Sequence, residues 1–194
     1  MNRCKTPLRY PGGKSKAINK LFEHFPPLMS YEEYREPFLG GGSVAIAVTK
    51  ARPDLPIWVN DLYWPLYNFW VHLRDRGEEL SNALHETKMN FDTPDKARTL
   101  FEQCKREITD KETTNFEKAV DYWIINKCSF SGLTESSTFS EYASVGNFNL
   151  RGIDDLKYYS KLIKNWKITN VSYENLLNEP MENGFIYQIG RAHV

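Results

Sequence analysis

The stretch Arg35-Glu36-Pro37-Phe38-Leu39-Gly40-Gly41-Gly42-Ser43-Val44-Ala45 decides the fold of this chain. Residues 34–38 have extended propensity, three consecutive glycines follow, and an apolar run continues to about Ala51. The pattern predicts the end of a strand, a tight turn and a buried helix capped by Ser43. Such a turn presents N–H groups to a ligand at the strand end, although an ordinary glycine-rich turn fits the same residues.

A second predicted strand, Ile57–Asn60, ends immediately before an acid. Asp61 follows Gly42 by 19 residues. An acid about 20 residues beyond the glycine turn is where Rossmann-like folds hold the ribose hydroxyls of a nucleoside cofactor. Asp61 is therefore a candidate ribose ligand, with the alternative that it caps the following helix.

Composition places the chain among folded proteins. Its 194 residues suffice for one domain, or one domain with an insertion, and 41% hydrophobic with 26% charged residues permits a packed core. The apolar runs are too short to span a bilayer and the N-terminus has no apolar signal core, so we expect a cytoplasmic protein. Cys4, Cys104 and Cys128 lack metal spacing, so neither a zinc site nor a disulfide framework is expected.

The net charge of the chain does not identify its binding partner. The net charge of +0 does not by itself indicate nucleic acid, whereas 11 Tyr, 11 Phe and 5 Trp suit stacking on bases as well as a core. Near the N-terminus, Lys14 and Lys16 open a helix predicted over 15–25, where the dipole disfavours cations. An anionic ligand would explain these lysines, and so would a solvated turn. The short spacing of Gly12-Gly13-Lys14-Ser15 excludes a phosphate-loop ATPase.

The middle of the chain is mostly helical. Amphipathic patterns predict helices over 63–74, 78–89, 94–108 and 116–127, then a polar loop over 134–151. A helix over 153–163, a strand over 167–171, a helix over 173–177 and a strand from Gly184 complete the chain. The loop's amides and aromatics, with Lys127 and Arg151 nearby, suit a nucleic-acid surface or a plain surface loop.

Four segments together resemble the Dam-type adenine-specific DNA methyltransferases. They are Arg9-Tyr10-Pro11-Gly12-Gly13-Lys14, then Glu36-Pro37-Phe38-Leu39-Gly40-Gly41-Gly42-Ser43, then Asn60-Asp61, and Asn126 with Ser131-Gly132-Leu133. The resemblance implies methyl transfer from S-adenosylmethionine to N6 of adenine in double-stranded DNA. It also implies an α/β, Rossmann-like methyltransferase fold with a helical target-recognition insertion. Adenine N6 lies inside the duplex, so the base must be flipped out to react.

The resemblance assigns roles to residues and boundaries to domains. The implied cofactor-binding residues are Tyr10, Lys14, Glu36, Pro37, Phe38, Gly40, Gly41, Gly42, Ser43 and Asp61. The implied DNA-binding residues are Asn126, Lys127, Ser131, Gly132 and Arg151. Residues 1–61 would begin the cofactor-binding core, 62–151 would form the recognition insertion, and 152–187 would return to the core sheet. No metal and no membrane partner is implied.

The sequence departs from the family at its end. The family's catalytic Asp-Pro-Pro-Tyr would follow the strand that begins Gly184-Phe185-Ile186-Tyr187, and it occurs nowhere in the chain. The ending Ile189-Gly190-Arg191-Ala192-His193-Val194 resembles a translated sequencing-library adapter, so we expect residues 188–194 to be a non-native tail on a truncated, inactive methyltransferase.

Two other functions fit parts of the pattern. A non-catalytic DNA-binding module would keep the recognition region and need no catalytic motif. A nicotinamide-dependent enzyme is weakened because Gly40-Gly41-Gly42 lacks the spaced glycine fingerprint. The DNA target, the biological role and the oligomeric state stay open.

Overall fold

The computed structural model describes residues 5–130, 132 and 136–189, which divide into two compact units. The first, called here the sheet unit, comprises residues 5–6, Gly12–Tyr67 and the described residues from 162 onward. The second, the helical unit, comprises Asn68–Lys161 and the segment Pro7–Pro11, which we call the strap. Each unit therefore combines segments that are distant in the sequence.

Parallel strands form the sheet of the first unit. In the described part of the chain these are β1 (Glu33–Glu36), β2 (Ile57–Asn60), β3 (Lys167–Thr169) and β4 (Gly184–Ile186), in the order β3-β2-β1-β4. The chain moves from β1 outward to β2 and β3, and then returns to β4 on the other side of β1. The carboxyl ends of β1 and β4 thus flank a switch point, where open α/β sheets bind ligands. The predicted α/β class is confirmed.

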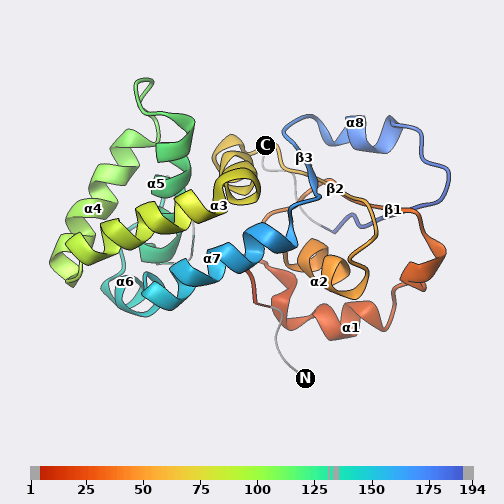
Figure 1. Ribbon diagram of the computed structural model, residues 1–194, viewed down its shortest axis with the longest axis horizontal. Coiled ribbons are helices and arrows are strands. Elements are labelled where there is room, and N and C mark those ends of the chain that lie inside the picture. Colours follow the sequence, from red (N-terminus) through yellow and green to blue (C-terminus); the bar gives the residue numbers. More distant parts are fainter. Residues whose placement is uncertain (1–4, 131, 133–135, 190–194) are drawn as a thin grey trace. The chain divides into compact units, whose positions relative to one another are not determined.

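Helices lie on both sides of these strands (Figure 1). α1 (Ile18–Phe22) and α2 (Ser43–Ala51) lie on one side, and α8 (Tyr173–Asn178) lies on the other. The predicted helix over 15–25 is wrong in extent, because a short 3₁₀ turn, η1 (Lys14–Lys16), precedes α1. A second 3₁₀ turn, η2 (Leu28–Ser30), leads to β1. Neither η1 nor α1 has a capping side chain or an acid in its first turn, which explains why no longer helix forms.

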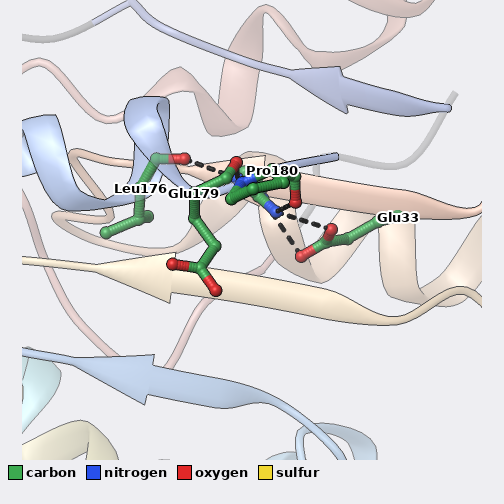
Figure 2. A network of polar contacts seen from close by, with 5 residues as sticks. Glu33, Leu176, Glu179 and Pro180 are labelled. Atoms are coloured by element: carbon green, nitrogen blue, oxygen red, sulfur yellow. Dashed lines mark hydrogen bonds and ion pairs between the residues drawn. The ribbon is translucent and has the colours of Figure 1, made fainter. Parts of the chain in front are cut away.

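Arg35 is a buried charge at the centre of the sheet. Its guanidinium donates through Nη1 to the carbonyl oxygens of Leu176 (2.6 Å) and Glu179 (2.8 Å). Nη2 donates to the carbonyl of Pro180 (3.2 Å) and pairs with the Glu33 carboxylate (2.9 Å). Figure 2 shows these four partners gathered at one point. Only 2% of Arg35 is exposed, so these bonds tie β1 firmly to the connection between α8 and β4.

The helical unit is built on α3 (Trp64–Asn90), α4 (Pro94–Glu107), α5 (Asn115–Cys128), α6 (Glu141–Asn147) and α7 (Leu150–Leu162). The helices predicted over 63–74 and 78–89 are the two parts of α3, which is interrupted at Arg76. Thr93 caps α4, and Thr114 forms a capping box with Glu117 at the start of α5, so both helices begin near the predicted positions. Fully buried Trp70, Phe101, Trp123 and Phe148 make up much of the core.

A titratable pair lies between α4 and α5. Cys104 and Asp121 are both buried, and one oxygen of Asp121 has no hydrogen-bond partner in the described structure. Burial raises the pKa of Asp121 to about 7, against an opposing hydrogen bond from the Cys104 thiol. Cys104 and Cys128 are free and buried, whereas Cys4 lies outside the described residues.

The loop predicted over 134–151 is partly wrong. Residues 141–147 form α6, because the Ser140 hydroxyl caps this helix by accepting from the Ala143 N–H (3.2 Å). Arg151 lies in the first turn of α7 rather than in a loop. Phe148, between the two helices, is fully buried and anchors the connection. The polar composition of this segment did not indicate α6, which is stabilised by the Ser140 cap and by the buried Phe148 ring.

Within the helical unit, α3 and α7 pack closely against each other at one point. Gly77 of α3 lies against Ser160 of α7, and a Cβ at Gly77 would come within 2.3 Å of the Ser160 Cβ. The Ser160 hydroxyl donates to the Arg74 carbonyl oxygen (3.5 Å). Only glycine permits this close approach, so residue 77 fixes where the two ends of the insertion meet.

Candidate functional site

The glycine turn after β1 is the centre of the candidate site. Gly40 and Gly42 have positive φ angles of 50° and 67°, and the Gly42 N–H donates to the Leu39 carbonyl (2.9 Å). Gly42, rather than Ser43, is the cap of α2, so the predicted capping role of Ser43 is wrong. The turn needs a left-handed residue at this position, and glycine takes that conformation without strain.

Asp61 at the end of β2 holds this turn. Its Oδ2 accepts from the Gly40 N–H (2.8 Å) and its Oδ1 accepts from the Tyr63 N–H (3.0 Å) just before α3. The predicted turn and the predicted acid therefore meet at neighbouring strand ends. Asp61 thus bonds through both carboxylate oxygens, to the glycine turn on one side and to the start of α3 on the other.

Glu36, the last residue of β1, is a buried carboxyl behind the same turn. Its Oε2 accepts from the Tyr34 hydroxyl (2.8 Å), and the Ala45 N–H at the start of α2 also donates to it. Burial, with a smaller contribution from the charge of Asp61, raises the pKa of Glu36 to about 8 against the opposing hydrogen bonds from Tyr34 and Ala45. Gly40 and Ala45 thus donate their N–H groups to protein carboxyls, so these two groups are not free for a ligand as the sequence suggested.

The Tyr187 side chain interacts electrostatically with this carboxyl. Tyr187 follows β4, its N–H donates to the Arg35 carbonyl (2.9 Å), and it is 5% exposed. Its hydroxyl has no hydrogen-bond partner in the described structure. Burial, with the charge of Glu36, raises the pKa of Tyr187 to about 12. The end of β4 therefore presents an unsatisfied polar atom beside the carboxyl at the end of β1.

Two asparagines that were not predicted as site residues hold the strand ends in place. Asn60 is 1% exposed, and its Nδ2 donates to the carbonyls of Pro37 (3.2 Å) and Val171 (3.0 Å). Asn170 donates to the carbonyl of Asp61 (2.7 Å). Asn60 stands beside Asp61 in the family resemblance, and an amide at the last position of a buried strand is the signal by which the sequence could have indicated it.

Of the remaining predicted cofactor residues, Tyr10 belongs to the helical unit and the others belong to the sheet unit. Lys14 belongs to the sheet unit, where its N–H donates to the Ser43 hydroxyl (3.1 Å) and its Nζ donates to the Gly12 carbonyl (2.9 Å). Tyr10 belongs to the strap of the helical unit and is half-buried. Pro37 is buried, and Phe38 contacts Tyr173 with ring centroids 5.5 Å apart.

The predicted DNA-binding residues differ in exposure. Asn126 is fully buried, and Lys127 is 8% exposed with its Nζ 5.1 Å from the centroid of the Trp123 ring. Burial, followed by the charge of Arg9, lowers the pKa of Lys127 to about 8. Gly132 is buried and Arg151 is exposed, whereas Ser131 lies outside the described residues. A role of these residues in DNA binding stays a prediction.

Within residues 5–130, 132 and 136–189, no group of three or more His, Cys, Asp or Glu side chains is placed to hold a metal ion. Likewise, none of the helices that the structure describes has the length and apolar character needed to cross a bilayer.

Comparison with protein families shows what the chain is similar to. The family described as D12 class N6 adenine-specific DNA methyltransferase matches residues 10–188, which include the glycine turn, Asp61 and the whole helical insertion. No curated protein matches the chain. The family match covers nearly all of the four segments on which the resemblance rested.

Proposed function

The chain belongs to the D12 class of N6 adenine-specific DNA methyltransferases, and we propose that its sheet unit is a Rossmann-like domain that binds S-adenosylmethionine. The single observation that carries this proposal is the hydrogen bond between the Gly40 N–H and Asp61 Oδ2 (2.8 Å). It shows that the positive-φ turn after β1 and the acid after β2 lie together, and these are the two features that bind the ligand in nucleoside-binding α/β folds.

The chemistry of the residues fits this cofactor. S-adenosylmethionine combines a ribose diol with a cationic sulfonium, and it supplies an electrophilic methyl group when bound. Asp61 is suited to accept hydrogen bonds from the ribose hydroxyls. Glu36, buried behind the turn, can compensate a cation by giving up its proton, because its pKa of about 8 lies close to neutrality. The unsatisfied Tyr187 hydroxyl marks a further polar position at the end of β4.

The helical unit is proposed to recognise the DNA. The substrate of the family is adenine in DNA, and a base must leave the stack before its N6 can react. The exposed Arg151 and the partly exposed turn after α5, with Phe130 74% exposed, offer a charge and an aromatic face to nucleic acid. The proposed division is cofactor binding by the sheet unit and target recognition by the helical unit.

The absence of Asp-Pro-Pro-Tyr leads to a second proposal. In these 194 residues no acid follows β4, where Tyr187 and Gln188 stand instead. We propose that the chain as given binds cofactor and DNA but does not transfer a methyl group. The same observation favours an alternative function, a non-catalytic DNA-binding module that does not use the cofactor. The family match argues against the nicotinamide-dependent alternative.

Calorimetric titration of S-adenosylmethionine into the chain tests the proposal. Asp61→Ala should weaken binding at least about tenfold, because it removes hydrogen bonds to a charged group. The matched control is Asp54→Ala, since Asp54 is an exposed aspartate of the same unit that pairs with Arg52. Equal affinity of the two variants would reject the assignment of Asp61.

Two further measurements separate the alternatives. A chain that melts cooperatively by circular dichroism but binds no S-adenosylmethionine would reject the cofactor site. Salt-dependent DNA binding in such a chain would support the binding-module alternative. Transfer of labelled methyl groups to DNA by the purified chain would reject the proposed loss of activity.

A further inference from the structure

Glu36 is a carboxyl group that is buried in the sheet unit without a cation to balance it. It is the last residue of β1, shortly before the glycine turn, and 4% of it is exposed. Among the described residues, no lysine, arginine or histidine forms an ion pair with Glu36. A buried carboxylate without a cation is costly, so Glu36 keeps a proton until a positive charge compensates its ionised form.

The groups that face Glu36 come from each element packed around it. From β1, the Tyr34 hydroxyl donates to Glu36 Oε2 (2.8 Å), and from the start of α2 the Ala45 N–H donates to the same side chain. Asp61, after β2, and Tyr187, after β4, interact with it electrostatically. Burial, opposed by the two donors and assisted by the charge of Asp61, raises the pKa of Glu36 to about 8. One added positive charge can therefore change its protonation at neutral pH.

S-adenosylmethionine differs in charge from its demethylated product, S-adenosylhomocysteine. Both molecules carry the same nucleoside, an ammonium and a carboxylate. When the methyl carbon is transferred, the electron pair of the S–C bond returns to the sulfur, so the positive sulfonium becomes a neutral thioether. A buried group that ionises only in response to the sulfonium can distinguish the two ligands, because charges interact strongly in a low-dielectric interior.

We propose that Glu36 is a specificity-determining residue that loses its proton when S-adenosylmethionine binds, and that it thereby makes the sheet unit prefer the cofactor to its product. The inference deepens the proposed function and rests on it, because it takes the glycine turn as the cofactor site. The proton passes to solvent, and the carboxylate that remains offsets the sulfonium charge. The product leaves the carboxyl protonated. Since ionisation becomes easier as the pH rises, the preference for the cofactor should grow with pH.

Calorimetric titration of both ligands into the full chain tests the proposal. Titrations at pH 7 in buffers of different ionisation enthalpy measure the number of protons released. S-adenosylmethionine should release about one proton per chain, because Glu36 is mostly protonated in the free protein, and S-adenosylhomocysteine should release less than half as many. The ratio of the two affinities should rise about tenfold between pH 6 and pH 8 in favour of the cofactor.

Three variants separate Glu36 from the ligand's own titration, which is the same for every protein. Glu36→Gln should abolish the proton release and make the affinity ratio independent of pH. Glu32→Gln, at an exposed glutamate just before β1, is the matched control and should behave as the wild type does. Tyr34→Phe removes a hydrogen bond that favours the Glu36 carboxylate. It should therefore move the rise in the affinity ratio to higher pH, by up to about one pH unit.

The outcomes distinguish the inference from the proposed function. Equal proton release by the two ligands, or wild-type release by Glu36→Gln, would overturn the inference alone. If Glu36→Gln does not fold, Tyr34→Phe decides, because an unchanged ratio profile or a shift to lower pH would overturn the inference. A wild type that melts cooperatively but binds neither ligand from pH 6 to pH 8 would overturn the proposed function, and the inference with it.

Discussion

Replacing Glu36 by glutamine should stabilise the protein at alkaline pH. The Glu36 carboxyl has a pKa of about 8 in the folded chain, against 4.5 for an ordinary glutamate, because it is buried behind the glycine turn. A pKa raised by folding means that the folded state binds more protons than the unfolded state between these values. The contribution of Glu36 to the free energy of unfolding is therefore highest below pH 4.5, where Glu36 is protonated in both states. It falls as the pH rises toward 8.

The size of the loss in stability follows from the difference between the folded and unfolded pKa of Glu36. Between pH 5 and pH 8 the loss amounts to about 3 kcal/mol for a buried group with these two pKa values. The amide introduced by Glu36→Gln does not titrate, and it can exchange hydrogen bonds with the Tyr34 hydroxyl. The groups that face this carboxyl from neighbouring elements are Tyr34, Asp61, Tyr187 and the Ala45 N–H, and they are the same in both proteins.

Urea unfolding of wild type and Glu36→Gln at a series of pH values measures the effect. The free energies of unfolding should be similar near pH 5 and diverge toward pH 8, with the variant more stable. Glu32→Gln, at an exposed glutamate just before β1, is the control and should run parallel to the wild type. If the Glu36→Gln curve also runs parallel to the wild type within about 1 kcal/mol, Glu36 titrates normally and the reasoning is wrong.

Three further predictions concern stability. Arg35→Met should lower the free energy of unfolding in urea by about 3 kcal/mol, because it leaves three carbonyl oxygens without their donor. Arg52→Met, which frees mainly the Leu28 carbonyl, should cost about 1 kcal/mol, and equal losses would contradict this account. Asp121→Asn should raise the melting temperature at pH 8 but not at pH 4, since burial raises the pKa of Asp121 to about 7; a pH-independent change would refute this. Gly42→Ala, at φ 67°, should lower stability in urea by about 1 kcal/mol, and an unchanged stability would show that the turn tolerates a side chain.

Local signals in the sequence predicted much of the fold. The strand Ile57–Asn60 was predicted to the residue, and α4 begins at the predicted Pro94, because an extended run and an amphipathic pattern are local features. The glycine turn after β1 was also predicted, whereas its hydrogen bond to Asp61 was not. These features depend on residues close together in the chain.

Features that depend on distant partners were missed. Arg35 lies in a short strand with charged neighbours, and its burial depends on carbonyls 141 to 145 residues away. The amide of Asn126 bonds to a residue 117 positions earlier, and the sequence did not predict this pairing. No local pattern indicates such pairings, because each becomes favourable only once the two segments are packed together. The short helix α6 was missed for a different reason, since its polar residues resemble a loop.

The contact between Gly77 and Ser160 has a consequence for the order in which the chain folds. β2 ends at Asn60 and its neighbour β3 begins at Lys167, so this pairing closes a loop of more than one hundred residues. If α3 and α7 meet first, the effective loop shrinks to a few tens of residues, and the entropic cost of closure falls by about 1 kcal/mol. The insertion should therefore collapse before β3 joins the sheet, and a bulkier residue at position 77 should slow refolding as well as weaken the native state.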